Sequence, residues 1–195
     1  MKYNISDVNE LLQNRRTIYP EQYTEREVDR EIIEAIINNA TWAPTHGLTQ
    51  PWRFKVFTGD SLQSLGQFQA ELYKSTVDEN RFVAGKYQKY KERPSKASAI
   101  IAVCMKRQES GKIPEVEEMA AVACAIQNMH LTATAYGVGA FWSTGAGMYK
   151  QETSRFLGLQ GEDKCVAFFY LGYPDIDWPK RQRKPLDSLT QWLAG

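Results

Sequence analysis

Two adjacent arginines, Arg15 and Arg16, precede the hydroxyl residue Thr17 near the start of the sequence. Together these groups can give a phosphate charge-assisted and bidentate hydrogen bonds. The same arginines can be solvated charges that complement the C-terminal end of a helix dipole, and the three residues by themselves favour that simpler interpretation. A phosphate site is indicated only if other groups join them.

A second basic cluster, residues 180–184, lies far away in the sequence between two prolines. Arg181 and Arg183 alternate there, and alternate side chains of an extended segment point the same way. The cluster therefore offers a second pair of guanidinium groups for one anion. A solubilising surface tail is the alternative, and it is the more common outcome for a run of charge.

Residues 43–52 bring an imidazole, hydroxyls, an amide and an indole together in a segment that contains Pro44 and Pro51. Such groups can read the polar edge of a heterocycle. His46 can instead be a satisfied loop histidine, which is the usual state of a lone histidine.

Residues 137–145 combine three glycines with aromatic side chains. One reason for such glycines is the close approach of a flat ligand to the backbone. Gly137 and Gly139 follow a predicted helix instead of opening one, so this segment is a weak match to a dinucleotide-binding fingerprint.

Helical and strand periodicity alternate along the whole chain, which predicts a mixture of α and β structure in layers. A capping box, Thr24 and Glu27, marks the start of the second helix, and the last 20 residues form a basic tail with a short helix. The pattern predicts helices over 6–14, 24–40, 60–73, 114–136 and 150–156, and strands over 52–57, 99–104, 139–143 and 165–171.

The longest predicted helix is apolar on most of its sides between Met119 and Tyr136. Such a helix must be covered all round. In a chain of 195 residues a partner subunit is the natural cover.

The composition argues against nucleic-acid binding, membrane insertion and a metal site. A net charge of +1 gives no field for nucleic acid, and the absence of a long apolar run or a leader segment predicts a cytoplasmic protein that does not enter a membrane. The three cysteines lie in apolar runs and are interpreted as buried thiols. No spacing of cysteine and histidine resembles a metal site, so no bound metal is expected.

The order of these motifs resembles the nitroreductase family of FMN-dependent oxidoreductases, in its short-chain branch, over nearly the whole chain. Arg15-Arg16-Thr17 is similar to the family's flavin-binding Arg-Arg-Ser element, and the loop from Ala43 to Trp52 resembles its Ala-Pro-Ser to Gln-Pro-Trp segment. The chain departs from the family at Leu48, where many members have a flavin-contacting asparagine. It departs again at Trp42, where the short-chain branch has a basic residue from the other subunit.

The resemblance implies an α+β nitroreductase-like fold, with a central mixed, mostly antiparallel sheet flanked by helices, in an interlocked homodimer. We expect a single domain over residues 1–195, with residues 74–96 as a mobile, substrate-covering excursion and 176–195 as a C-terminal tail. The residues implied to bind FMN are Arg15, Arg16, Thr17, Trp42, Pro44, Thr45, His46, Gln50, Trp142, Ser143, Thr144, Gly145, Arg181 and Arg183.

The activity implied is a ping-pong oxidoreductase that takes hydride from NADH or NADPH and reduces a nitroaromatic, a quinone or a similar small acceptor. The flavin carries the chemistry, so no side-chain acid or base is assigned as catalytic. Arg53 and Lys55 are candidates for positive charge near the flavin pyrimidine edge. Three alternatives stay open: dehalogenation or dehydrogenation by FMN on the same fold, a flavin-binding dimer with little turnover, and a phosphate or nucleotide binder without flavin.

Overall fold

A four-stranded antiparallel sheet forms the centre of the computed structural model, which describes residues 2–145, 147–180 and 182–193. Its strands follow the order β1-β2-β4-β3. Thr17 adds an isolated parallel bridge to Ala140 on the open edge of β3. The bounds are β1 (Trp52–Phe57), β2 (Ala99–Met105), β3 (Gly139–Ser143) and β4 (Lys164–Gly172).

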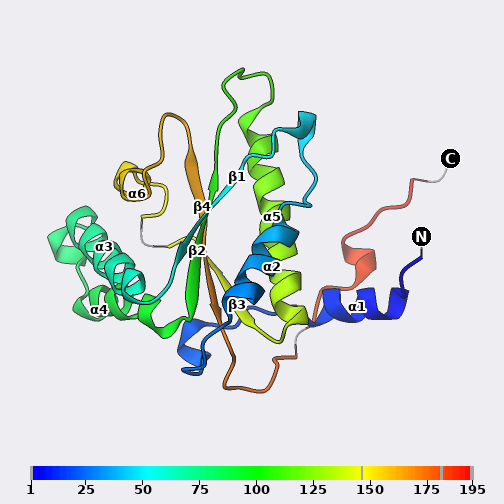
Figure 1. Ribbon diagram of the computed structural model, residues 1–195, viewed down its shortest axis with the longest axis horizontal. Helices are drawn as coiled ribbons and strands as arrows, with labels where there is room; N and C mark the ends of the chain where they lie inside the picture. Colours follow the sequence, from blue (N-terminus) through cyan, green and yellow to red (C-terminus); the bar gives the residue numbers. More distant parts are fainter. Residues whose placement is uncertain (1, 146, 181, 194–195) are drawn as a thin grey trace.

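Helices cover both faces of this sheet, which gives three layers (Figure 1). On one face lie α2 (Arg30–Ala40) and α5 (Glu115–Ala135). On the other face lie α3 (Asp60–Thr76), α4 (Ala84–Glu92) and α6 (Gln151–Phe156). The predicted α+β arrangement is therefore confirmed. Short 3-10 turns occupy Pro20–Gln22, His46–Leu48, Glu79–Arg81, Pro94–Lys96 and Leu186–Ser188.

The first helix, α1 (Ile5–Asn14), projects away from these layers beside the C-terminal segment (Figure 1). None of its residues is buried, although Val8 and Leu12 form an apolar stripe. The C-terminal segment contains a single 3-10 turn where we expected a short helix. No helix of the described residues has the length and apolar composition to cross a membrane.

The central strands separate two hydrophobic cores. Every residue of β2 is buried, as predicted for a strand covered on both faces. Ile101 and Val103 face the core under α2 and α5, whereas Ile100 and Ala102 face the core under α3 and α6. This alternation is the two-residue repeat of a strand.

Two further predictions from the sequence are wrong. The second helix begins at Arg30 and not at the capping box, because the Thr24 backbone N–H donates to the Tyr173 carbonyl and its hydroxyl accepts from Arg26 N–H. Tertiary hydrogen bonds therefore hold this segment extended. Cys124 is exposed on α5, whereas Cys104 and Cys165 are buried as expected. An apolar run along a helix includes the exposed face as well as the covered ones.

Tyr23 packs against two glycines at the edge of the sheet. Its hydroxyl donates to the Ile18 carbonyl at 2.8 Å, and its ring lies directly over Gly172. A Cβ at Gly139 would lie 3.0 Å from Ile18 Cβ and 3.1 Å from Tyr23 Cε1. Gly139 thus serves the packing of this chain, whereas Gly137, at φ 68°, ends α5 in the left-handed region.

We predict that Gly172→Ala lowers the free energy of unfolding by about 1–3 kcal/mol, because the added methyl group would overlap the Tyr23 ring in a tightly packed edge. Urea unfolding measures this change. Gly85→Ala in α4 is the matched control, since a Cβ there meets nothing within 4 Å. Equal stability of the two variants would contradict the packing role of Gly172.

Candidate functional site

The two basic segments predicted from the sequence meet at the end of α1. Arg15, Arg16, Thr17 and Arg183 line one hollow of about 190 Å³, together with Tyr19 and Pro179. The Trp178 indole N–H donates to the Asn14 carbonyl, and Arg16 Nε donates to the Pro179 carbonyl at 2.6 Å. These hydrogen bonds join residues more than 160 positions apart in the sequence.

Positive charge accumulates in this hollow. Burial lowers the pKa of Arg15, and the neighbouring charges of Arg183 and Arg16 lower it further. No ion pair joins Arg15 or Arg183 to an acidic side chain among the described residues. Like charges held together in this way favour an anion between them.

Arg16 has a different position from the one expected of a phosphate ligand. Its guanidinium donates to the backbone carbonyls of Gln13, Arg15 and Pro179. It therefore fastens the tail to the end of α1 and leaves Arg15 and Arg183 as the less engaged cations. Arg181, the other predicted tail arginine, lies outside the described residues.

Strand β3 brings the predicted aromatic segment to the same edge. Ile18 N–H donates to the Ala140 carbonyl at 3.0 Å, next to the bridge from Thr17 to Ala140. Trp142 lies two residues farther along β3 and is exposed on the α5 side that Ala140 shares. Ser143, Thr144 and Gly145 follow it.

Gly145 places the 74–96 segment near this edge. A Cβ at Gly145 would lie 3.9 Å from the Tyr90 hydroxyl oxygen of α4. Tyr87 on the same helix donates to Glu71 of α3 at 2.6 Å, which holds α4 against α3. The aromatic segment thus borders the β3 end of the candidate site through Tyr90.

The loop of residues 42–50 extends from the C-terminal half of α5 to the first turn of that helix. Trp42 N–H donates to the Asn39 carbonyl, and Asn39 is hydrogen-bonded to Asn128 and Thr132 of α5. His46 Nδ1 is hydrogen-bonded to Glu117 in the first turn of this helix, whereas His130 near its last turn contacts Ala140 beside Thr17. A helix of 21 residues is about 30 Å long. Within one chain, the His46 end of the loop therefore lies far from the arginines, whereas Trp42 lies nearer to the C-terminal half of α5. The predicted site residues of this loop are Trp42, Pro44, Thr45, His46 and Gln50.

Backbone strain marks this loop. Leu48 at φ 53° and Gln50 at φ 45° are the non-glycine residues with positive φ in the described part of the chain. The Thr45 hydroxyl accepts from Gln50 N–H at 3.3 Å and lies 3.0 Å from the Thr49 hydroxyl. Side chains larger than asparagine are unfavourable in this region, and such strain clusters at functional sites.

The loop also exposes large apolar groups. Trp42 and Leu48 are each 79% exposed, so this one loop presents two large apolar side chains to solvent. Both positions are those at which the chain departs from the family pattern. The loop therefore presents an apolar surface where many relatives present polar groups.

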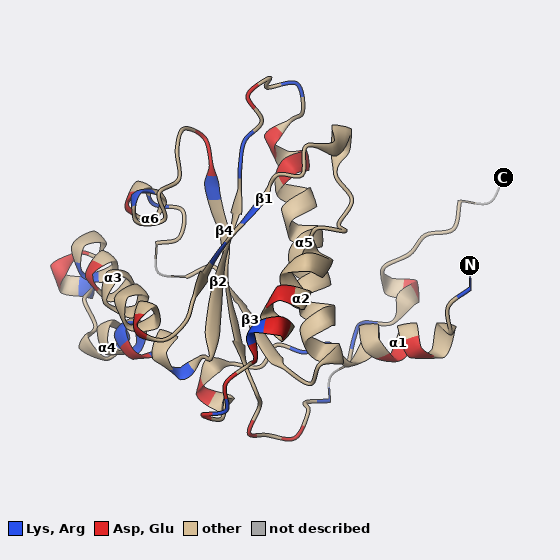
Figure 2. Cartoon of the chain, viewed as in Figure 1, with Lys and Arg blue, Asp and Glu red and all other residues tan. Residues whose placement is uncertain are grey.

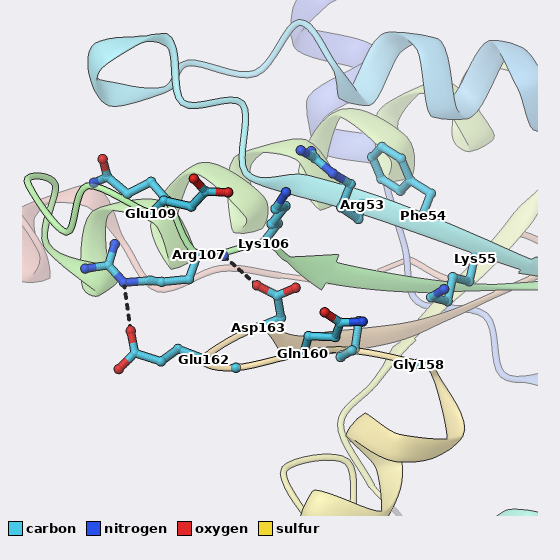
Figure 3. A pocket seen from close by; sticks show the side chains of 13 residues that line it. Arg53, Phe54, Lys55, Lys106, Arg107, Glu109, Gly158, Gln160, Glu162 and Asp163 are labelled. Carbon is cyan, nitrogen blue, oxygen red and sulfur yellow. Dashed lines mark hydrogen bonds and ion pairs between the residues drawn. The ribbon is translucent and has the colours of Figure 1, made fainter.

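Arg53 and Lys55 lie on β1, at the opposite edge of the sheet from β3. They line a separate hollow of about 770 Å³ with Lys106, Arg107 and Asp163 (Figure 3). Asp163 accepts from Arg107 N–H at 2.8 Å in this hollow. Arg53 and Lys55 therefore lie too far from Arg15 and Arg183 to add positive charge to that hollow within one chain.

His130 is a buried residue of the site that the sequence did not single out. Its Nε2 lies 3.2 Å from the Ala140 carbonyl, and its ring packs edge-on to Phe169. Arg15 is close enough to affect its protonation. The sequence signal that could have identified His130 is its position in the last two turns of the apolar helix α5, shortly before β3.

A family model for "Nitroreductase family" matches residues 12–173, from α1 to the end of the sheet. The chain belongs to the nitroreductase family. Escherichia coli (strain K12) YdjA, whose name assigns it provisionally as an NAD(P)H nitroreductase, is 30% identical over 174 residues, which are 87% of this chain and 90% of YdjA. The residues matched by the family model include the α1 arginines and the strained loop.

Solved structures show the same fold as this nitroreductase-family chain. A nitroreductase-like family protein from Bacillus cereus superposes with a TM-score of 0.85 at 24% identity, covering 100% of this chain and 99% of the other. A protein from Desulfovibrio desulfuricans, described as a nitroreductase in complex with FMN, superposes with a TM-score of 0.71 at 24% identity and covers the same shares.

We predict that His130 makes the stability of this protein depend on pH. Burial, and next the Arg15 charge, lower the pKa of His130 from 6.5 to about 4. Between these values the unfolded chain binds a proton that the folded chain does not, so the free energy of unfolding falls by up to about 3 kcal/mol as the pH drops from 6.5 to 4.

Urea unfolding of the wild type and of His130→Gln measures this contribution, because glutamine can still donate to the Ala140 carbonyl but does not titrate. The difference in stability between the two proteins is expected to change across the window from pH 6.5 to 4 and to be constant above it. A parallel loss of stability in both proteins would contradict the assignment.

Proposed function

We propose that this chain is an FMN-dependent oxidoreductase that takes hydride from NADH or NADPH and reduces a nitroaromatic, a quinone or a similar small acceptor. The convergence of Arg15 and Arg183 on one hollow beside Thr17 carries the proposal, since neither has an acidic partner in the part of the chain that the structure describes. A monoester phosphate is a compact dianion that fits such a donor set. The names of YdjA and of the FMN complex from Desulfovibrio support the same cofactor and donor.

The residues of this chain would hold FMN in two parts. Arg15, Arg183 and the Thr17 hydroxyl would bind the phosphate end, and Trp142 with Ser143 would lie along the remainder of the group. Arg16 supports this site indirectly, because its hydrogen bond to the Pro179 carbonyl holds the tail against α1. When bound, FMN supplies the chemistry of hydride acceptance and donation, and the protein supplies binding, orientation and electrostatics.

We further propose that the site is completed by a second copy of the chain. An exposed seam runs along α5 through Val116, Ala120, Cys124 and Gln127, and Figure 2 shows charge on this helix only in its first turn. Val116 is 71% exposed. Small and apolar residues along a helix face allow a second helix to pack closely against it.

A twofold axis perpendicular to α5 at its middle would place the α5 of the second copy antiparallel to the α5 of the first. The loop end of the partner's α5 would then lie beside the arginine end of this one. This arrangement would bring one chain's His46 loop to the other chain's Arg15 hollow, which a single chain separates by the length of α5. The exposed stripe of α1 and the apolar C-terminal residues would gain cover in the same dimer.

The access side of the proposed site is bordered by α4. Tyr90 lies near Gly145, and its ring packs on Tyr73 at 5.4 Å between centroids. We propose that donor and acceptor use this side in turn, in a ping-pong sequence, with the aromatic side chains of residues 74–96 selecting among them. Exclusion of water by these rings would protect the transferred hydride.

The purified protein is expected to be yellow and to bleach when NADH or NADPH is added without oxygen. Arg15→Ala and Arg183→Ala are each expected to weaken FMN binding by about tenfold or more, because each removes a charge-assisted hydrogen bond to the phosphate. Flavin absorbance after purification and titration of the apoprotein with FMN measure both effects.

Arg30→Ala is the matched control, since Arg30 pairs with Glu34 on the exposed surface of α2. A colourless protein would favour a phosphate binder without flavin, and a yellow protein that does not bleach would favour a flavin-binding module. Full FMN content in the Arg15→Ala, Arg183→Ala double variant would refute the phosphate site.

The dimer predicts a specific effect at Cys124, the residue next to the middle of α5. Cys124→Arg is expected to place two charges face to face near the twofold axis, to dissociate the dimer and to lose FMN. Cys124→Ser keeps the size of the side chain and is expected to retain both. Light scattering after size-exclusion chromatography, with circular dichroism to verify folding, measures the outcome. A folded, dimeric Cys124→Arg protein would refute this interface.

A further inference from the structure

Cys104 of β2 and Cys165 of β4 are direct partners across the two central strands. Both are buried, and both belong to the core under α3 and α6. Neither residue takes part in the proposed flavin site, which lies at the far edge of β3. The pair therefore needs an account of its own, and one that does not depend on the proposed function.

A β-bulge makes this pairing possible. Val103 pairs with Ala167, whereas the next residue, Cys104, pairs with Cys165, so Val166 has no partner in the ladder. Val166 and Ala167 consequently both face the core under α2 and α5. Without the extra residue, Cys104 would face Val166 and the two thiols would lie on opposite faces of the sheet.

The positions of the two residues match the requirements of a disulfide. Directly opposed residues of an antiparallel pair have Cα atoms about 4.5–5.5 Å apart. Cα atoms joined through a disulfide are usually about 4.4–6.8 Å apart. Cys104 and Cys165 therefore need only small side-chain adjustments to be linked, with no change in strand register.

The electrostatics favour Cys104 as the nucleophile of the pair. A hydrogen bond from the Cys165 thiol lowers the pKa of Cys104 against the effect of burial, and the Lys55 ammonium lowers it further. The same interaction with Cys104, together with burial, raises the pKa of Cys165. Figure 3 shows Lys55 on β1, beside β2. A thiolate is the reactive form of cysteine.

A small reagent has a route to Cys165, and the fully buried Cys104 lies directly across the strands from it. Cys165 lines a hollow of about 370 Å³ together with Met148, Tyr149 and Ser154 around α6. Gly161, Glu162 and Asp163 line both this hollow and the one that contains Lys55. Small oxidants can enter such spaces, whereas larger disulfides cannot.

We propose that Cys104 and Cys165 form a reversible intrachain disulfide on exposure to a small hydroperoxide such as hydrogen peroxide. The Cys104 thiolate attacks one peroxide oxygen, the O–O bond breaks, and the departing hydroxide takes a proton to become water. The Cys165 sulfur then attacks the resulting Cys104 sulfenic acid, the S–S bond forms, and hydroxide leaves with the Cys165 proton as a second water. Two thiols are oxidised and one peroxide is reduced.

The test uses the full-length protein as purified, in the wild type and in Cys124→Ser. Each protein is treated with hydrogen peroxide, its remaining thiols are blocked with iodoacetamide in denaturant, and it is digested with trypsin without reduction. Mass spectrometry is expected to find peptide 97–106 linked to peptide 165–180 in both proteins. Dithiothreitol is expected to abolish the linked species.

Two further variants separate the roles of the sulfurs. Cys165→Ser is expected to accumulate a Cys104 sulfenic acid that dimedone traps, because the resolving thiol is missing. Cys104→Ser is expected to give neither linkage nor trapping at Cys165. The wild-type measurement stands by itself if either variant fails to fold.

Glutathione added to each sample provides the reference for the dose of peroxide, because Cys124 lies in the interface of the proposed dimer. Recovery of fully alkylated Cys104 and Cys165 at a dose that oxidises the glutathione would overturn the proposal. Linkage of either residue to Cys124, or oxidation of both to sulfonic acid without linkage, would overturn it as well.

Discussion

The packing of the C-terminal tail against the end of α1 is the contact on which the candidate site depends. Arg16 and Trp178 each donate to a backbone carbonyl of the other segment, and these hydrogen bonds hold Arg183 close to Arg15. The two charges repel each other, so the contact is maintained by backbone hydrogen bonds and not by the arginines that it brings together. An anion in the hollow would remove the repulsion.

Helix α5 sets the second constraint. It buries one side on the sheet and reaches from the strained loop near His46 to the arginines near His130. Because a helix of this length is rigid, the two groups cannot meet within one chain. The proposed dimer uses the same rigidity to bring them together from different chains, and the small residues of the exposed seam allow the close approach that this requires.

Sequence patterns predicted an element well where both of its faces are buried or where a residue next to it in the sequence ends it. Strand β2 was found from its continuous apolar run, and the end of α5 was found from Gly137, which adopts the positive φ expected of a helix terminus. The patterns failed where distant groups compete for the same backbone atoms. Thr24 has the sequence of a helix cap, yet its N–H is bonded to Tyr173 from the end of the sheet.

By itself, the sequence determined which chemical groups are present: two basic segments, a polar loop, an aromatic strand and an apolar helix, in the order of the nitroreductase family. Only the tertiary structure decided which of them act together. It showed that Arg16 fastens the tail while Arg15 and Arg183 have no acidic partner among the described residues. It also showed that Gly139 makes room for Tyr23 and that one bulge turns Cys165 toward Cys104. Periodicity and capping act over a few residues, whereas these assignments depend on hydrogen bonds and packing between residues up to more than 160 positions apart.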